Sequence, residues 1–433
     1  MAQLKSRVPM VCRLLETLFL DLRSRVTEPN SAAIARTTFR CELLSNAFGG
    51  ILQAGFSTFA LLLAIRAYGA NEYEKAILAG AMSAGLLVAP VGLSLMRATR
   101  YSVNRLACGL MVFAGLCLLV VFSTQSLMVY VTGLAVAQIA IAQQPTLRIH
   151  VHTNNYSPSG RGRRLAWVFM VAGLSSIASS YGFGLFLDYR WDDYSWVFAI
   201  MALAAILCGS TLALIPTGRL RGDSQAGLGL RGSLRMVRGD KLFAIVLLGW
   251  MLLGLGWIST APLRIEYLSA KEGLNMSNSQ IALLTVAIPS LTEILFLRFF
   301  GGLFDRTNFV PFRIALNFFL IFSILLFFHG KTFSTLCIAS IFTGLAFGGS
   351  SIAWSLWVTR LASPGKEAAY MSIHMALTGV RGMLAPFLGY YLLMQIGFEG
   401  AAWVAAGFLI LSTFFFLGVR KNKRLDPVLV EKS

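Results

Sequence analysis

Charged side chains are scarce in this chain. Asp, Glu, Lys and Arg make up only 13% of its 433 residues, whereas 56% are hydrophobic, and the mean hydropathy is +0.70. A soluble domain of this length does not need so much apolar material to fill its core. The composition therefore predicts an integral membrane protein, with the lipid bilayer as its main partner.

Acidic residues are the scarcer of the two charge signs. The chain has 19 Asp and Glu against 37 Lys and Arg, which gives a formal net charge of +18. Such a basic balance is also found in nucleic-acid-binding proteins, but a basic excess on the cytoplasmic side of a membrane explains it more simply. We therefore expect no nucleic-acid partner.

Cysteine, histidine and the common catalytic motifs are also rare. There are six cysteines and four histidines, and five of the cysteines fall in or beside apolar stretches, which argues against a disulfide framework. His150 and His152 have the spacing of a metal pair, but no acid or Cys completes a site. No phosphate-binding glycine loop and no nucleophile elbow occurs. We expect no enzyme activity, no cofactor and no metal.

The beginning of the chain does not have the pattern of a cleavable signal peptide. Its apolar run is interrupted by Arg13, Glu16 and Asp21, whereas a signal needs an uninterrupted apolar core. Residues 11–26 instead place leucines on one helical face. This pattern predicts a helix that lies on the inner leaflet, and a helix packed on the bundle remains equally open.

Long apolar stretches dominate the remainder of the chain. With about 17 to 25 apolar residues needed for one crossing, the sequence predicts twelve membrane-spanning helices. They lie near residues 41–65, 76–96, 103–122, 126–149, 164–187, 195–215, 242–268, 279–299, 311–328, 332–359, 368–396 and 398–418.

The basic residues are unevenly distributed between alternate loops. The strongly basic segment 216–241 separates the sixth span from the seventh. If that segment is cytoplasmic, thirty of the 37 Lys and Arg fall on the cytoplasmic side. This asymmetry predicts that both termini are cytoplasmic, and a bacterial inner membrane is the expected location.

The two halves of the sequence repeat one another. Thr132-Gly133-Leu-Ala in the fourth span matches Thr343-Gly344-Leu-Ala in the tenth, and Ser-Pro precedes both the fifth and the eleventh span. Such repeats are typical of two bundles related by an axis along the membrane normal. We expect an N-terminal segment 1–36, a six-helix bundle 37–215, a basic linker 216–241, a second bundle 242–420 and a tail 421–433.

Twelve spans in two sets of six, with Gly301-x-x-x-Asp305-Arg306-x-Asn308 between the eighth and ninth spans, resemble the major facilitator superfamily of transporters. The resemblance implies an all-α membrane protein with two pseudo-symmetric six-helix bundles, acting as a monomer by alternating access. It also implies a cytoplasmic charge latch formed by Asp305 and Arg306. The N-terminal copy of this motif keeps Arg97 but has Met96 at the Asp position, which predicts a weaker latch.

Arg381 is the most informative single residue. It lies about fourteen residues into the eleventh span, near the middle of the bilayer, where a cation costs at least about 2.5 to 3.5 kcal/mol. It therefore needs water, a carboxylate or an anionic ligand. A role in substrate binding is favoured, and a buried ion pair that holds two helices together is the alternative.

Two further titratable residues lie at a similar depth. His374 shares a helical face with Thr378 and Arg381, and Glu293 is the only acid that the predicted boundaries place well inside a span. Either residue could carry a coupling proton, and either could be part of a structural hydrogen-bond network.

Polar and aromatic stripes follow the spans that the resemblance predicts to line a central cavity, namely the first, fourth, seventh and tenth. Packing is the alternative explanation of each aromatic stripe. The predicted substrate-binding residues are Asn46, Gln53, Gln143, Gln144, Trp257, Trp354, Trp357 and Arg381.

These residue types favour secondary active or facilitative transport of a small polar or anionic organic solute. Two alternatives remain open. One is a transporter-like sensor or scaffold that signals through its N-terminal segment. The other is a drug/proton antiporter that depends on Glu293, although Arg381 disfavours a cationic substrate.

Overall fold

The computed structural model of the 433-residue chain describes residues 31–219, 230–362 and 367–425. The helix expected within residues 11–26 therefore lies outside the described residues, as does most of the expected tail 421–433.

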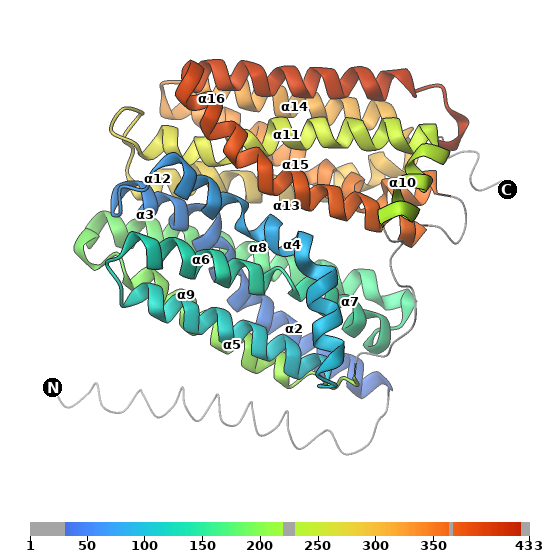
Figure 1. Cartoon of the computed structure of the whole chain (residues 1–433), viewed down its shortest axis with the longest axis horizontal. Coiled ribbons are helices and arrows are strands. Elements are labelled where there is room, and N and C mark those ends of the chain that lie inside the picture. The colour runs from blue at the N-terminus through green and yellow to red at the C-terminus, as the bar shows by residue number, and fades with distance from the viewer. Residues whose placement is uncertain (1–30, 220–229, 363–366, 426–433) are drawn as a thin grey trace.

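The described residues are almost entirely helical. Two bundles lie side by side, one built from the first half of the chain and one from the second (Figure 1). The helices of the first half are α2 (Ser31–Ala54), η1 (Gly55–Phe59), α3 (Ala60–Arg66), α4 (Glu72–Ala98), α5 (Val103–Phe122), α6 (Leu127–Ile141), α7 (Gln144–Asn155), α8 (Pro158–Tyr189), η2 (Trp191–Asp193) and α9 (Trp196–Ala213). Those that follow are α10 (Leu230–Gly239), α11 (Lys241–Ser269), α12 (Asn278–Ala282), η3 (Leu283–Ala287), α13 (Ile288–Arg306), α14 (Phe309–His329), α15 (Phe333–Leu361), α16 (Glu367–Gly418) and η4 (Lys423–Leu425).

The expected fold class is confirmed. Within the described ranges, 11 helical segments are long and apolar enough to cross a membrane. The last of them, α16, is interrupted at Gly397, whose φ of 70° and ψ of −176° are not helical. Glycine adopts such a φ without the steric cost that a side chain would add. The break separates the expected eleventh and twelfth spans, so that twelve segments traverse the molecule.

Several helices extend beyond the expected spans. The first begins at Ser31 rather than near residue 41, so Glu42 lies well inside α2. Part of the basic segment expected to be a loop forms helix α10. The fourth span is divided into α6 and α7 because Pro145 stands in the first turn of α7 and cannot donate the hydrogen bond that would continue α6.

The two ends of the molecule differ in their chain connections. Ser31, α10 and Leu425 lie at one end, to the right in Figure 1, which we call the terminal end. The loops that follow α3, α5 and α8 lie at the other end, which we call the distal end. The contacts between the bundles are described below by the end at which they lie.

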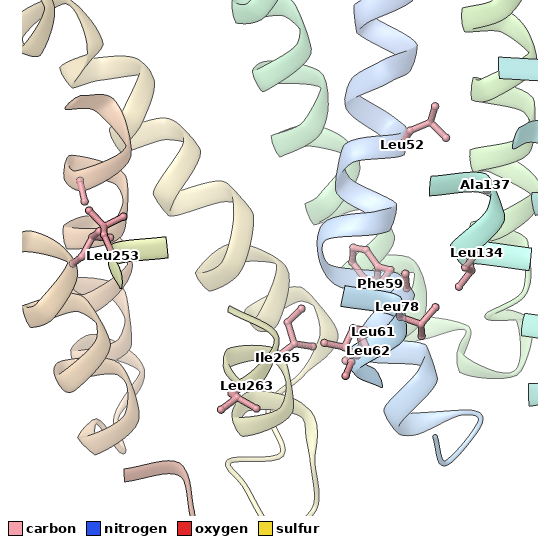
Figure 2. Packing of buried hydrophobic residues seen from close by; sticks show 14 of the residues in the cluster. Leu52, Phe59, Leu61, Leu62, Leu78, Leu134, Ala137, Leu253, Leu263 and Ile265 are labelled. Atoms are coloured by element: carbon pink, nitrogen blue, oxygen red, sulfur yellow. The ribbon is translucent and has the colours of Figure 1, made fainter. Parts of the chain in front are cut away.

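Apolar residues pack within each bundle and between the bundles. Figure 2 shows Ile265 of α11 beside Leu61 and Leu62 of α3, and all three side chains are buried. Large apolar side chains such as Leu95, Met128 and Phe299 point outward and are exposed, as expected for surfaces that face lipid.

Candidate functional site

A central cavity of about 870 Å³ lies between the two bundles. Its first wall comes mainly from α2, η1, α4, α6, α7 and α8, and its second from α11 together with Pro386 of α16. It extends from Leu61 and Ile265, on the distal side, to Ile149 and His152 near the terminal end. Residues from both halves of the chain therefore face one shared volume.

Polar side chains of the central cavity come from the first bundle. Asn46, Gln53 and Gln144 line it. The Asn46 amide accepts a hydrogen bond from Arg148 Nη1 at 3.0 Å and donates one to the Glu42 carbonyl at 2.8 Å. The second bundle contributes the apolar residues Ile258, Ala261, Pro262 and Ile265.

Glu42 is a buried acid that the expected span boundaries placed at a helix end. Its side chain is 1% exposed. One carboxylate oxygen lies 2.5 Å from His152 Nε2, and the other accepts a hydrogen bond from the Tyr156 hydroxyl at 2.5 Å. Glu293 is thus not the only acid well inside a span. The helix starts ten residues earlier than the apolar pattern suggested, because the mostly polar residues 37–40 are tolerated in its first turns.

A second cavity of about 390 Å³, which we call the side cavity, lies inside the C-terminal bundle. It is lined by residues of α11, α14, α15 and α16, among them Trp257, Trp354 and Arg381. Ile258 lines both cavities, so the two volumes adjoin at that residue. The structure thus places three of the predicted binding residues together.

Arg381 is 5% exposed and does not meet a carboxylate. Its Nη1 donates to the Trp250 carbonyl, and its Nε has no acceptor within the described part of the chain. The guanidinium lies against Gly254, where an added Cβ would collide with Arg381 Nε. Glycine at position 254 therefore leaves room for the Arg381 side chain. The alternative prediction, that Arg381 forms a buried ion pair with an acid, does not agree with these contacts.

Arg313 also lines the side cavity, although the expected span 311–328 placed it at the cytoplasmic end of a helix. The helix α14 begins at Phe309, and Arg313 is fully buried at 0% exposure. Its Nε donates to Asn317 Oδ1 at 3.1 Å and its Nη1 to Ser350 Oγ at 2.9 Å.

Arg264, near the end of the expected span 242–268, is also buried. Its two terminal nitrogens donate to Thr343 Oγ1 at 2.7 Å and to Ser323 Oγ at 2.9 Å, and its guanidinium lies 4.5 Å from the Trp257 ring centroid. It joins α11 to α14 and α15 and lines neither cavity. This hydrogen-bonding pattern is that of a structural arginine.

His374 is surrounded by aromatic rings. Trp250, Trp354 and Trp357 have ring centroids within 5.6 Å of its own, and its exposed fraction is 1%. Trp357 packs between Phe243 and His374 and is 1% exposed. These two predicted site residues form the packed layer behind the side cavity and do not line it.

Two other predicted residues lie away from both cavities. Gln143 is buried and donates to the Gly85 carbonyl at 2.8 Å, which ties the turn between α6 and α7 to α4. Glu293 accepts a hydrogen bond from Ser351 Oγ at 2.7 Å. Because Ser351 lines the side cavity, Glu293 stands behind that cavity's wall.

Hydrogen bonds join the two bundles at the distal end. Lys75 of α4 lies 3.0 Å from a carboxylate oxygen of Glu266 on α11, and both residues are buried. Arg66 Nη1 donates to Asn278 Oδ1 at 2.6 Å, and Asp188 accepts from the backbone N–H of Asn278 at 2.7 Å. The segments η1 and η3 meet through Thr58 and Thr285, whose hydroxyl oxygens are 3.0 Å apart.

The predicted latch residues lie at the terminal end. Arg97, Asp305 and Arg306 are exposed. Within the described ranges, no hydrogen bond or ion pair joins their side chains to the opposite bundle. The sequence motif therefore has its expected position on α13, but it does not connect the halves in this structure.

Two helical bundles with a cavity between them are the arrangement that the resemblance to the major facilitator superfamily implied. Residues 265–432 match the family model of the Major Facilitator Superfamily. No curated protein matches the chain by sequence.

Solved structures with the same fold cover most of the chain. A mutant form of the nucleoside transporter NupG has a TM-score of 0.75 at 13% identity and covers 90% of this chain and 100% of its own. A bacterial homologue of the human lysosomal transporter Spinster has a TM-score of 0.67 at 14% identity, covering 92% and 99%. A D-xylose-proton symporter has a TM-score of 0.66 at 13% identity, covering 88% and 96%.

The resemblance noted from the sequence is thereby confirmed, by the family match in the C-terminal half and by the fold over nearly the whole described chain. The described chain has 11 helical segments long and apolar enough to cross a membrane, and its C-terminal part matches the Major Facilitator Superfamily model.

Proposed function

We propose that this protein carries a small polar or anionic organic solute across a membrane by alternating access, as a secondary active or facilitative transporter. We further propose that it acts as a monomer in a bacterial inner membrane with both termini on the cytoplasmic side. The distribution of basic residues supports this orientation.

The observation that carries the proposal is the central cavity. Both halves of the chain line it, and the contacts of Lys75, Arg66 and Asp188 cross between the halves on its distal side only. A rocking motion that breaks these contacts and closes the terminal end would expose the same residues to the other side. With the terminal end cytoplasmic, this structure corresponds to the inward-facing state.

The fold alone does not select the solute. Proteins of similar fold include a nucleoside transporter, a D-xylose-proton symporter and the human organic anion transporter MFSD10, the last with a TM-score of 0.58 at 15% identity. The choice of a polar or anionic solute rests on side chains. Amides of Asn46, Gln53 and Gln144 supply hydrogen-bonding groups, and Arg381 supplies positive charge.

The gating and coupling roles are extensions of this proposal. Arg97, Asp305 and Arg306 would contact the opposite bundle when the terminal end closes. If a proton is the coupling ion, Glu293 and His374 are the residues proposed to carry it. Glu42, bonded to the cavity-lining His152, is a further acid that such a mechanism can use.

The test is solute uptake into liposomes that contain the purified full-length chain. Organic anions, nucleosides, sugars and amino acids are offered separately, with and without a proton gradient. We expect uptake of at least one class, and we expect Arg381→Ala to reduce it strongly while the protein still inserts. Uptake that equals that of protein-free liposomes for every class would contradict the proposal.

Two other functions make different predictions. A sensor or scaffold would bind a partner through residues 1–36 and move no solute. A drug/proton antiporter would exchange lipophilic cations and depend on Glu293. The uncompensated positive charge of Arg381 favours the anion transporter over the cation exchanger.

A further inference from the structure

The side cavity contains two arginine side chains from different helices. Arg313 of α14 and Arg381 of α16 both line it, and both contact Trp250 of α11. The guanidinium of Arg313 lies 5.1 Å from the Trp250 ring centroid, while Arg381 donates to the Trp250 carbonyl. One tryptophan thus brings two positive charges to the same volume.

Negative charge near these two arginines is limited. None of the described residues that line the side cavity is an Asp or a Glu. One acid, Glu293, contacts the wall from behind through Ser351 Oγ. Burial of a charged group is costly unless a counter-charge or hydrogen bonds compensate it. The two guanidiniums therefore carry more positive charge than the single carboxylate of Glu293 behind the wall can balance.

Some of the arginine donors have no acceptor in the protein. Arg313 Nη2 and Arg381 Nε are both buried and unbonded within the described ranges, and so is Trp250 Nε1. Arg264 in the same bundle also has a buried, unbonded Nε, but both its terminal nitrogens are bonded to hydroxyl groups and it lines neither cavity. Unpaired buried donors on a cavity wall are well suited to bind an oxyanion, because a guanidinium offers a planar set of N–H groups.

Aromatic side chains form much of the remaining wall. Trp257, Trp354 and Phe347 line the side cavity together with the hydroxyls of Ser350 and Ser351. Flat aromatic walls favour a flat ring, through stacking and apolar contact. The volume of about 390 Å³ is in the range of small-molecule pockets.

We propose that the side cavity binds a flat-ring organic anion, with Arg313 and Arg381 holding its anionic group and Trp257 and Trp354 contacting its ring. This inference rests on the proposed transport function and narrows its substrate class. The solute enters from the central cavity past Ile258, which lines both volumes. Arg313 is thereby assigned to substrate binding together with Arg381.

The experiment measures ligand binding to the detergent-purified full-length chain, by thermal shift and by calorimetric titration. The probes are benzoate, phthalate, benzamide, benzylamine and succinate. Benzoate and phthalate combine a ring with negative charge, benzamide has the ring without charge, benzylamine has a positive charge, and succinate has charge without a ring. We expect benzoate and phthalate to raise Tm and the other three to have little effect.

Variants test which residues are responsible. We expect Arg313→Gln and Arg381→Gln each to weaken benzoate binding roughly 10- to 100-fold, the range of a hydrogen bond to a charged group. Arg313→Lys keeps the charge but loses the planar fork, so its affinity is expected between that of the wild type and Arg313→Gln. The exposed Arg190, which pairs with Asp193 at 3.1 Å, provides the control Arg190→Gln with unchanged binding.

The inference is overturned if benzoate does not bind, if benzylamine binds better than benzoate, or if Arg313→Gln binds benzoate as the wild type does. If Arg313→Gln does not give a folded protein, Arg313→Lys carries the test, and unchanged benzoate affinity in that variant overturns the role of Arg313. Failure here is separable from failure of the transport proposal. Uptake of another solute without benzoate binding leaves transport standing, whereas benzoate binding without uptake of any solute removes transport and keeps the site.

Discussion

The two ends of the interface between the bundles are held in different ways. At the distal end, charged and polar side chains of one bundle are bonded to the other, with Lys75 and Glu266 buried at 3.0 Å. At the terminal end, Arg97, Asp305 and Arg306 are exposed and bond to nothing across the gap in the described residues. The distal end is joined by these contacts in this structure, and the terminal end carries the residues that we propose to make a second closure.

This difference is what the proposed alternating-access mechanism expects of one of its two states. A single rigid assembly would be expected to join its halves along the whole interface. Here the central cavity lies on the terminal side of the distal contacts. Substitutions at each end test whether side-chain contacts join the bundles at the distal end and not at the terminal end.

The largest effect is expected from Glu266→Ala at the distal end. It removes the buried partner of the Lys75 ammonium and leaves only the partly exposed Glu72 carboxylate at 3.7 Å. Loss of one partner of a buried pair costs up to about 3 to 5 kcal/mol. The Tm of the purified protein should fall accordingly. The double variant Lys75→Met with Glu266→Leu removes both charges and should recover most of the loss. A single variant that melts like the wild type would show that this ion pair does not hold the distal end.

A second distal contact depends on glycine. A Cβ at Gly184 of α8 would lie 2.6 Å from Ser279 Cα, whereas Gly182 in the same helix has nothing within 4 Å. We expect Gly184→Val to destabilise the protein by about 1 to 3 kcal/mol through overpacking. Gly182→Val has the same helix propensity change and is the matched control. Equal Tm values for the two variants would contradict the close approach of α8 and α12.

Asp240 tests a charged contact at the terminal end that stays within one bundle. It caps α11 by accepting from the Phe243 N–H at 3.1 Å, and it pairs with Arg424 at 2.8 Å. Burial opposes its ionisation, but hydrogen bonds from Arg424, Phe243 and Tyr370 outweigh burial and lower the pKa of the Asp240 carboxyl. Asp240→Ala should therefore cost about 1 kcal/mol at neutral pH, as loss of a helix cap does.

The same carboxyl gives a pH dependence of known sign. Its pKa in the folded protein is below its value in the unfolded chain, so its stabilising effect is complete above the ordinary aspartate pKa. The effect is lost as pH falls through that ordinary value toward the lowered one. The Tm difference between wild type and Asp240→Ala should shrink over that range. A difference that grows on acidification would contradict the assignment.

The smallest effect on stability is expected from Asp305→Asn. This side chain is exposed and unbonded across the interface in the described residues, so the free energy of unfolding should change by less than about 0.5 kcal/mol. If Asp305 instead closes the terminal end in the other state, the uptake rate should fall although Tm does not. A large loss of Tm would show that the terminal end is already bonded in the present state.

The sequence predicted the number and order of helices well, because a bilayer requires about 20 apolar residues for each crossing. It did not predict the burial of Arg264, Arg313 and Glu42. Each charge lies near the end of an apolar run, where the pattern alone cannot separate a loop from a helix that continues. Their burial depends on hydroxyl, amide and histidine partners from helices distant in sequence.

The candidate site was predictable only in part. Helical periodicity places Trp257 and Arg381 on polar or aromatic faces, and the structure brings both to the side cavity. The sequence could not show that Gln143 and Trp357 turn toward packing contacts. That outcome depends on where neighbouring helices approach, as at Gly85 and Phe243.

The most direct test of alternating access is a pair of distance measurements with spin labels in a cysteine-free version of the chain. One pair replaces the exposed distal residues Arg190 and Lys271, and the other replaces the exposed residues Arg105 and Gly302 at the terminal end, which leaves the proposed gating residues intact. With a transported solute present, we predict a new population in which the distal pair is farther apart and the terminal pair is closer. Distances that stay fixed at both ends, or that change in the same direction, would contradict the account.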